Sequence, residues 1–159
     1  MASSGSSGKD AAWTPPVAFY FKVTFHGDPA IPDTNFKEVS GLTVDMDVET
    51  VKEGGENNFT HQLPLRLKHN RLVLKRALEN MDNALEKWVK DNLENGFSIG
   101  FTPRNITITL LDNKGEPFSQ WLCNNAYPAK WDLNTLDAEK NALAIETLEL
   151  NYNLLSRTK

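Results

Sequence analysis

The chain has 159 residues, 40% of them hydrophobic and 24% charged, which is enough for one domain with a sizeable core. Its formal net charge of −4 argues against nonspecific nucleic-acid binding, which needs a basic surface, and no apolar run approaches the roughly 20 residues of a membrane helix. The single cysteine, Cys123, excludes an intramolecular disulfide, which is typical of proteins of a reducing compartment.

The N-terminal segment is rich in serine and glycine. The stretch MASSGSSG has no side chains that could form a core, so it predicts a flexible leader of native or cloning origin. Pro15 and Pro16 follow, and neither can donate a backbone hydrogen bond to a helix or a sheet. We therefore expect a leader at residues 1–14 and one domain at residues 15–159.

The segment 17–25 carries the clearest strand pattern in the chain. Apolar residues occupy every second position, and three of them are phenylalanines that would fill much of a small core: Val17, Phe19, Phe21, Val23 and Phe25. Gly27, Pro29 and Pro32 then predict a loop over residues 26–33.

The segment 39–67 predicts two strands joined by a long polar tip. Its first part alternates apolar residues (Leu42, Val44, Met46 and Val48) with polar ones, the pattern of a strand half buried in a sheet. The tip at residues 52–58 contains two adjacent glycines and is too long for a two-residue turn. Apolar residues return at Phe59, Leu63, Leu65 and Leu67, and Gly41 marks a bulge or a close contact. This pattern indicates an extended arm that contacts something outside its own domain.

An extended stretch at residues 72–76 precedes the one predicted helix. Asp82 can cap its N-terminus, and Gly96 can end it. Its apolar stripe consists of Leu85, Trp88, Val89 and Leu93. Glu86 and Lys90 are spaced for an ion pair one turn apart.

The C-terminal half reads as strands. A hairpin is expected from residues 106–110, a turn at 112–115 and a second strand at 118–123 that Pro128 bounds. A final strand at 142–155 changes phase near Glu146, which predicts a bulge or a switch of sheet there. Together these elements predict a mainly β fold with about seven strands: a small antiparallel β-barrel or two-sheet sandwich with a long β-arm and one packed helix.

Patterns typical of catalysis or cofactor binding are weak. The three histidines, His26, His61 and His69, have no metal-ligand spacing with Cys123. The glycine-rich segment 52–56 lacks the Gly-Lys-Ser/Thr of a phosphate-binding loop, and a row of carboxylates at residues 45, 47 and 49 is typical of a solvated strand face. We therefore predict no catalytic, cofactor-binding or metal-binding residue and no enzymatic activity.

Six stretches, in chain order, resemble one known family. They are FKEVSGL (36–42), EGGEN (53–57) with HQLP (61–64), NRLVLKR (70–76), ITLLD (108–112) with Gly115, NAYPAKW (125–131) and AIETLEL (144–150). The resemblance is to the tail-tube proteins of contractile phages and of phage-tail-like extracellular injection systems, and it spans residues 17–155.

The resemblance implies a structural role. Such proteins form six-fold rings that stack into a hollow tube, which a contracting sheath drives through a target envelope. The expected partners are further copies of the chain, the sheath protein, spike and baseplate proteins, and any cargo in the lumen. The chain would be cytoplasmic during assembly and then part of a virion or of an extracellular or cell-anchored injection particle. The predicted inter-subunit arm consists of Glu49, Lys52, Glu53, Gly54, Gly55, Glu56, Asn57, Asn58 and Phe59.

Two other roles remain open at this stage. The chain could instead form the ring that starts the tube and adapts the spike to it, since the EGGEN and HQLP stretches resemble the baseplate-proximal members of the family. More distantly, a small β-barrel could bind a ligand, which requires a concave polar pocket.

Overall fold

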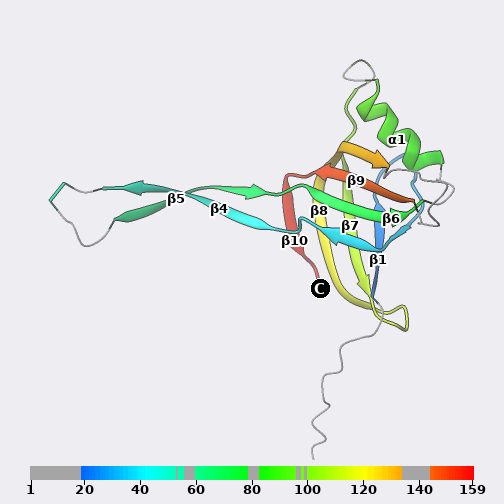
Figure 1. Cartoon of the computed structure of the whole chain (residues 1–159), viewed down its shortest axis with the longest axis horizontal. Coiled ribbons are helices and arrows are strands. Elements are labelled where there is room, and N and C mark those ends of the chain that lie inside the picture. Colours follow the sequence, from blue (N-terminus) through cyan, green and yellow to red (C-terminus); the bar gives the residue numbers. More distant parts are fainter. Residues whose placement is uncertain are drawn as a thin grey trace, which may run out of the picture.

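The computed structural model describes residues 19–52, 54–55, 60–78, 83–95, 98, 100–133 and 144–159. These residues form ten strands and one helix, arranged as a curled body from which one long ribbon projects (Figure 1). The elements are β1 (Tyr20–Phe25), β2 (Thr34–Phe36), β3 (Glu38–Ser40), β4 (Val44–Val51), β5 (His61–His69), β6 (Leu72–Ala77), α1 (Asn83–Leu93), β7 (Arg104–Leu111), β8 (Pro117–Leu133), β9 (Ile145–Asn151) and β10 (Leu154–Arg157).

The body is one eight-stranded antiparallel sheet that folds back on itself. Its strand order is β2-β1-β7-β8-β9-β6-β3, and β10 pairs with β8. The long strand β8 belongs to both halves, because its first part pairs with β7 and β10 and its second part pairs with β9. The change occurs near Asn125, whose φ of 52° is a left-handed value that asparagine tolerates.

The sheet curls without closing into a hydrogen-bonded barrel. Strands β2 and β3 stand at opposite ends of the strand order, yet only Lys37 separates them in the chain. Among the described residues no ladder joins β2 to β3, so the chain itself bridges the two edges. The mainly antiparallel β class with one helix is confirmed, in the form of a curled, two-layered sheet.

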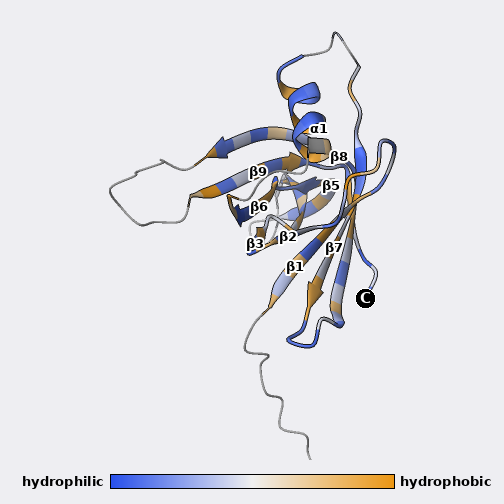
Figure 2. Cartoon of the chain, turned by 90° about the vertical axis from the view of Figure 1, so that its right-hand side faces the viewer, coloured by the Kyte–Doolittle hydropathy of each residue, from blue (hydrophilic) through white to orange (hydrophobic). Residues whose placement is uncertain are grey.

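The core lies inside this curled sheet and under the helix. Buried side chains from every second strand position meet there, and apolar and polar residues alternate along the body strands (Figure 2). The buried apolar residues include Val23, Phe25, Leu72, Leu74, Ile106, Ile108, Leu148 and Leu150. Each such side chain contributes about 1.5–3 kcal/mol when it is removed from water.

Helix α1 packs on the core through a shorter stripe than the sequence predicts. Leu85, Trp88 and Val89 are buried, and the Trp88 ring meets Phe25 edge-on at 5.7 Å between ring centroids. Leu93, the last residue of the helix, is exposed. The predicted pair is confirmed, with Lys90 Nζ 2.5 Å from Glu86 Oε1. The predicted capping residues at positions 82 and 96 lie outside the described residues.

The phase change predicted near Glu146 is absent. Strand β9 alternates without interruption, and Glu146 points inward on the same face as Leu148 and Leu150. Its carboxylate accepts hydrogen bonds from Arg76 Nε at 2.7 Å and from Trp131 Nε1 at 2.5 Å. A charged residue at a core position therefore gave the false impression of a phase shift, because its partners are distant in sequence.

The switch of sheet falls later in the chain. Two residues, Tyr152 and Asn153, separate β9 from β10, and β10 pairs with the first part of β8 instead of the second. The final segment is therefore two strands and not one.

Pro128 lies within β8 and does not end it. It stands opposite Leu150 in β9, next to a register shift between Pro128 and Lys130. A proline cannot donate to a ladder, but a bulge relieves that requirement. The predicted boundary at this proline was wrong for this reason.

Candidate functional site

A two-stranded ribbon, which we call the arm, extends well away from the body (Figure 1). It consists of β4 and β5, which pair only with each other and form a sheet separate from the body. The predicted pair of strands with a long tip is therefore confirmed. None of the residues in the body core belongs to the arm. The arm consequently adds little to the hydrophobic core of its own chain. As an isolated two-stranded hairpin it is expected to be only marginally stable in water.

A β-bulge interrupts the arm near its middle. Met46 pairs with Leu67 and Val48 pairs with Pro64, so the single residue Asp47 stands opposite two residues of β5. Directly opposed residues in an antiparallel ladder share a face. We call the face that carries Val44, Met46 and Val48 the first face, and the face that carries Asp45, Asp47 and Glu49 the second face.

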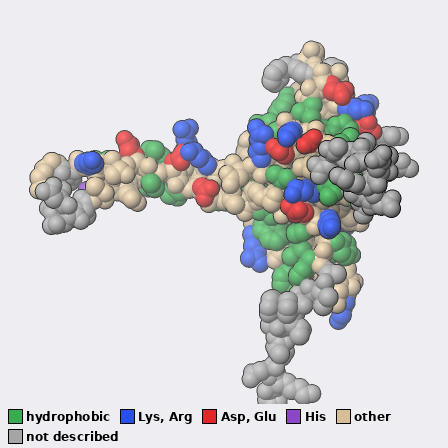
Figure 3. Space-filling view, viewed as in Figure 1, with side chains coloured by type: hydrophobic (Ala, Val, Ile, Leu, Met, Phe, Trp, Pro, Cys, Tyr) green, Lys and Arg blue, Asp and Glu red, His purple; other side chains and the backbone are tan. Residues whose placement is uncertain are grey.

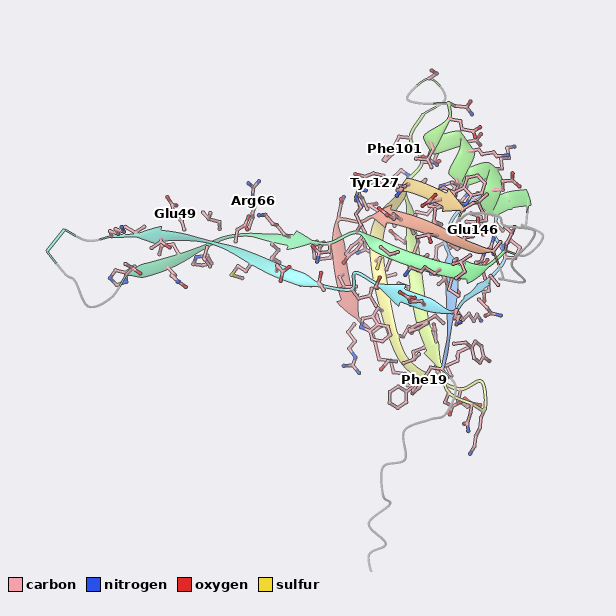
Figure 4. All side chains as sticks on the ribbon, viewed as in Figure 1. Phe19, Glu49, Arg66, Phe101, Tyr127 and Glu146 are labelled. Atoms are coloured by element: carbon pink, nitrogen blue, oxygen red, sulfur yellow. The ribbon has the colours of Figure 1, made fainter. Side chains whose placement is uncertain are left out.

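On the second face, acidic and basic side chains pair with each other beside the bulge. Asp47 lies 2.6 Å from Lys68 Nζ and 3.6 Å from Arg66 Nε. Arg66 and Glu49 both project from the ribbon into open space (Figure 4). Ion pairs this exposed contribute about 0–1 kcal/mol each, so they keep the face wet without fixing the arm rigidly.

The apolar side chains of the arm are exposed within the chain. Seven of them have between 38% and 59% of their surface accessible: Val44, Met46, Val48, Val51, Leu63, Leu65 and Leu67. The alternation predicted a strand half buried in a sheet, and within this chain that burial is absent along the described arm. Hydrophobic and charged side chains intermingle along the ribbon surface (Figure 3). Exposed apolar area of this extent is typical of a protein–protein contact.

The root of the arm is held closely to the body. Gly41 has φ +87°, and a Cβ there would come within 1.8 Å of the Arg71 carbonyl oxygen, so only glycine fits. The Tyr152 hydroxyl donates to the Gly41 carbonyl oxygen at 2.8 Å, and burial raises the pKa of this phenol. The His69 ring packs against Tyr152 at 5.1 Å between ring centroids. The close contact predicted at Gly41 is confirmed.

The structure places only some of the predicted arm residues. Glu49 lies in β4 and Lys52 follows it. Gly54 and Gly55 form an exposed turn, where a Cβ added to either glycine would meet no described atom within 4 Å outside its chain neighbours. The residues at positions 53 and 56–59 lie outside the described residues. Sequence reasoning missed the root contacts of His69 and Tyr152, because nothing local marks two aromatic rings from separate strands as neighbours.

Pockets elsewhere on the described surface are small. One hollow of about 180 Å³ lies between α1 and the loop at Asp28, above the buried Arg104, and one of about 140 Å³ lies beside Arg76. The described residues contain no group of histidine, cysteine, aspartate or glutamate side chains that could hold a metal ion. No described helix has the length and apolarity required to cross a bilayer.

Comparison with known families settles the kind of protein. The sequence profile of the T4-like virus tail tube protein gp19 matches residues 17–156, which is most of the chain. The chain belongs to the T4-like virus tail tube protein gp19 family. The resemblance seen in the sequence is thereby confirmed. The prediction that the protein is not an enzyme is confirmed as well, because the tail tube family is structural. Curated protein sequences gave no significant match.

Solved structures of contractile injection systems contain similar chains. A chain of the anti-feeding prophage baseplate, 6-fold symmetrised, is 30% identical, with a TM-score of 0.76 and coverage of 91% of this chain and 96% of that one. A chain of the PVC sheath-tube complex in the extended state is 24% identical, with a TM-score of 0.72 and coverage of 98% and 99%. The cap that terminates the anti-feeding prophage tube contains a chain 22% identical, with a TM-score of 0.73 and coverage of 97% of both.

These matches show in which class of assembly this chain belongs. It is a tube-like structural protein of contractile phage tails or injection particles. The two matches below 25% identity show the shared fold alone. Relatives come from the tube, its cap and the baseplate, so the class is settled at this coarser level.

Proposed function

We propose that this protein is a subunit of the inner tube, which assembles into stacked hexameric rings and is driven through a target envelope when the sheath contracts. The observation that carries the proposal is the arm, a ribbon of exposed apolar side chains that the described residues of the chain leave uncovered. A neighbouring copy that covered these side chains would gain about 25 cal/mol for each Å² of apolar surface buried. Repeating such a contact around and along a tube gives rigidity without a large energy at any one contact.

The proposed inter-subunit residues are those at the distal part of the arm. They are Glu49, Lys52, Glu53, Gly54, Gly55, Glu56, Asn57, Asn58 and Phe59. Glu49 lies in β4 and Lys52 directly follows it, both exposed, in the part of the arm that is far from the body (Figure 1). The proposed partners beyond the chain itself are the sheath protein on the outside of the tube, spike and baseplate proteins at its end, and any cargo in its lumen.

The second candidate is a ring at the baseplate that starts the tube and adapts the spike to it. Its support is the 30% identity to a chain of the anti-feeding prophage baseplate. The two roles differ in what triggers assembly: an inner-tube subunit forms rings with itself, whereas an adaptor ring requires a spike or baseplate template.

The ligand-binding alternative has little support. The space inside the described sheet is occupied by buried apolar side chains, among them Leu72, Leu74, Ile106 and Leu150. Three hollows at the described surface have volumes of about 140, 180 and 250 Å³, whereas ligand pockets are typically about 300–1,000 Å³.

The deciding experiment measures the mass of the purified protein in solution as its concentration rises, followed by negative-stain electron microscopy. Six-fold rings or stacked tubes of the protein alone support the inner-tube role. A persistent monomer that forms a ring only after addition of spike or baseplate protein supports the adaptor role. A persistent monomer in both conditions contradicts both.

A further inference from the structure

Arg104, the first residue of β7, is a buried cation without a partner of opposite charge. Only 6% of its surface is accessible, and no described group accepts a hydrogen bond from its buried Nη1. The other buried arginine, Arg76, also has an unpartnered Nη2, but its charge is balanced by Glu146 at 2.7 Å. Among the described carboxylates, none forms an ion pair with Arg104. The two buried guanidinium groups therefore differ in whether their charge is compensated.

The surroundings of Arg104 compensate its charge only in part. Burial lowers the pKa of the guanidinium, and the charge of Asp28 acts in the opposite direction. The Trp88 ring lies 5.9 Å from Cζ, which gives a cation–π contact. A ring face does not supply the oxygen acceptor that a guanidinium N–H requires. Because an arginine side chain stays protonated in proteins, an anion beside Arg104 would supply both the missing charge and the missing acceptor.

A hollow of about 180 Å³ lies beside this cation, and Arg104 forms part of its lining. Trp88, from helix α1, and Thr102, just before β7, also line it. Trp88 Nε1 donates to the Thr102 carbonyl oxygen at 2.9 Å, and the Thr102 N–H donates to Asn92 Oδ1 at 3.2 Å. These two hydrogen bonds fix one wall of the hollow to the helix. The hollow is smaller than a typical ligand pocket, but it has room for a single small functional group.

The charges around the hollow favour a group with one negative charge. Lys87 lines it and adds a second cation. Asp28 and Asp91 line it as well, so they would repel a doubly charged anion more strongly than a singly charged one. Asp28 is itself exposed to solvent, which screens its charge, whereas Arg104 is buried. A planar carboxylate matches the planar guanidinium in shape and carries a single charge.

We propose that this hollow is a binding site for one carboxylate group, which accepts a hydrogen bond from Arg104 and is attracted by Lys87. A small free carboxylic acid and an acidic side chain of another protein share this chemistry. The site lies on the body beside α1, on the side away from the arm (Figure 1). It is therefore independent of the contacts proposed for the arm.

The test measures unfolding of the dilute, unassembled protein while sodium acetate replaces sodium chloride at constant ionic strength. We expect acetate at about ten times its dissociation constant to lower the equilibrium constant of unfolding of the wild type about tenfold. Arg104→Met keeps an apolar side chain of similar length and should abolish this stabilisation. Should that variant fail to fold, Arg104→Lys keeps the charge but not the planar fork, and should bind acetate about tenfold more weakly.

Two control variants separate this site from a general effect of salt. Arg71→Met removes an arginine that pairs with Glu149 at the surface, and its response to acetate should equal that of the wild type. Asp28→Asn removes a repulsive charge and should tighten acetate binding about threefold. Equal stabilisation of the wild type and Arg104→Met would contradict the proposal. Acetate that stabilises Asp28→Asn but not the wild type would mean that Asp28 itself fills the site, and would contradict the proposal too.

A blocked peptide distinguishes the two sources of the carboxylate. In acetyl-Gly-Glu-Gly-amide the only carboxylate is that of the glutamate side chain. Binding about tenfold tighter than that of acetate would assign the site to an acidic side chain of another protein, and equal or weaker binding to a small free acid. Protection by neither probe contradicts the carboxylate site. Ring formation by Arg104→Met, measured separately, leaves the inner-tube role standing in that case.

Discussion

The body and the arm are built from the same alternation of apolar and polar residues, but they cover the apolar residues differently. In β6 and β9 the alternate side chains Leu72, Leu74, Leu148 and Leu150 are buried in the core of the body. In β4 and β5 the corresponding side chains remain exposed. The difference shows that alternation encodes a sheet face with one apolar side, whereas the topology decides whether the same chain covers that side.

The largest effect on stability is expected at the buried ion pair of the body. Changing Glu146 to glutamine removes the charge that balances Arg76, which is itself buried beside the Phe36 ring. Breaking a buried pair in this way destabilises a protein by about 3–5 kcal/mol. Urea denaturation monitored by tryptophan fluorescence measures the loss.

The control for that change is a pair of the same kind on the surface. Glu149 lies 3.0 Å from Arg71, whose side chain is largely exposed. Glu149→Gln is expected to cost about 0–1 kcal/mol. Equal losses for the two variants would contradict the distinction between a buried and an exposed pair.

The next effect contrasts a core leucine with an arm leucine. Leu74→Ala leaves a cavity in the body and is expected to lower the free energy of unfolding by about 2–5 kcal/mol. Leu67→Ala in the arm is expected to change it by less than about 0.5 kcal/mol. Denaturation of dilute, unassembled protein compares the two. A large loss from the arm variant would show that the arm belongs to the body core after all.

A smaller effect on stability is expected at the root of the arm, where the arm meets the body. Tyr152→Phe removes the hydroxyl that donates to the Gly41 carbonyl oxygen and should cost about 0.5–1.5 kcal/mol. The amides at the root of the arm should exchange with solvent faster, while those of β7 should not change. Hydrogen exchange with mass spectrometry resolves these segments. Unchanged exchange at the root would mean that the Gly41 backbone alone fixes the arm.

The smallest expected effect is on the way the stability of the protein depends on pH. The hydrogen bond from Lys22 lowers the pKa of Asp33, although both side chains are about two-fifths exposed. Because the folded-state pKa is the lower one, the contribution is present above the unfolded-state value near 3.8 and is lost as the pH falls through the folded-state value. Asp33→Asn should lower stability by about 0–1 kcal/mol at pH 7 and have no effect at very acidic pH. Urea denaturation at both pH values checks this.

Much of the fold could be predicted from local sequence patterns. The strand at Tyr20–Phe25, the helix stripe at Leu85 and Trp88, and the turn at Gly115 were all marked by periodicity or turn residues. The family followed from ordered motifs and not from any single pattern. These features depend on neighbours in sequence, which is why the sequence shows them.

The rest depended on contacts between distant residues. Glu146 is buried because Arg76 and Trp131 pair with it, and Pro128 is tolerated because a bulge adjoins it. The bulge opposite Asp47 depends on how β4 and β5 pair, and alternation along either strand does not reveal it. The faces of the arm could therefore be assigned only from the structure.

The most direct test of the account is amide hydrogen exchange of the arm before and after assembly. In the dilute monomer the amides of β4 and β5 should exchange quickly, because a two-stranded ribbon is marginally stable alone. In assembled rings or tubes the same amides should become protected, while the amides of β6 and β9 should remain protected throughout. An arm that exchanges equally fast in both states would contradict the claim that its apolar side chains are covered by another copy of the chain.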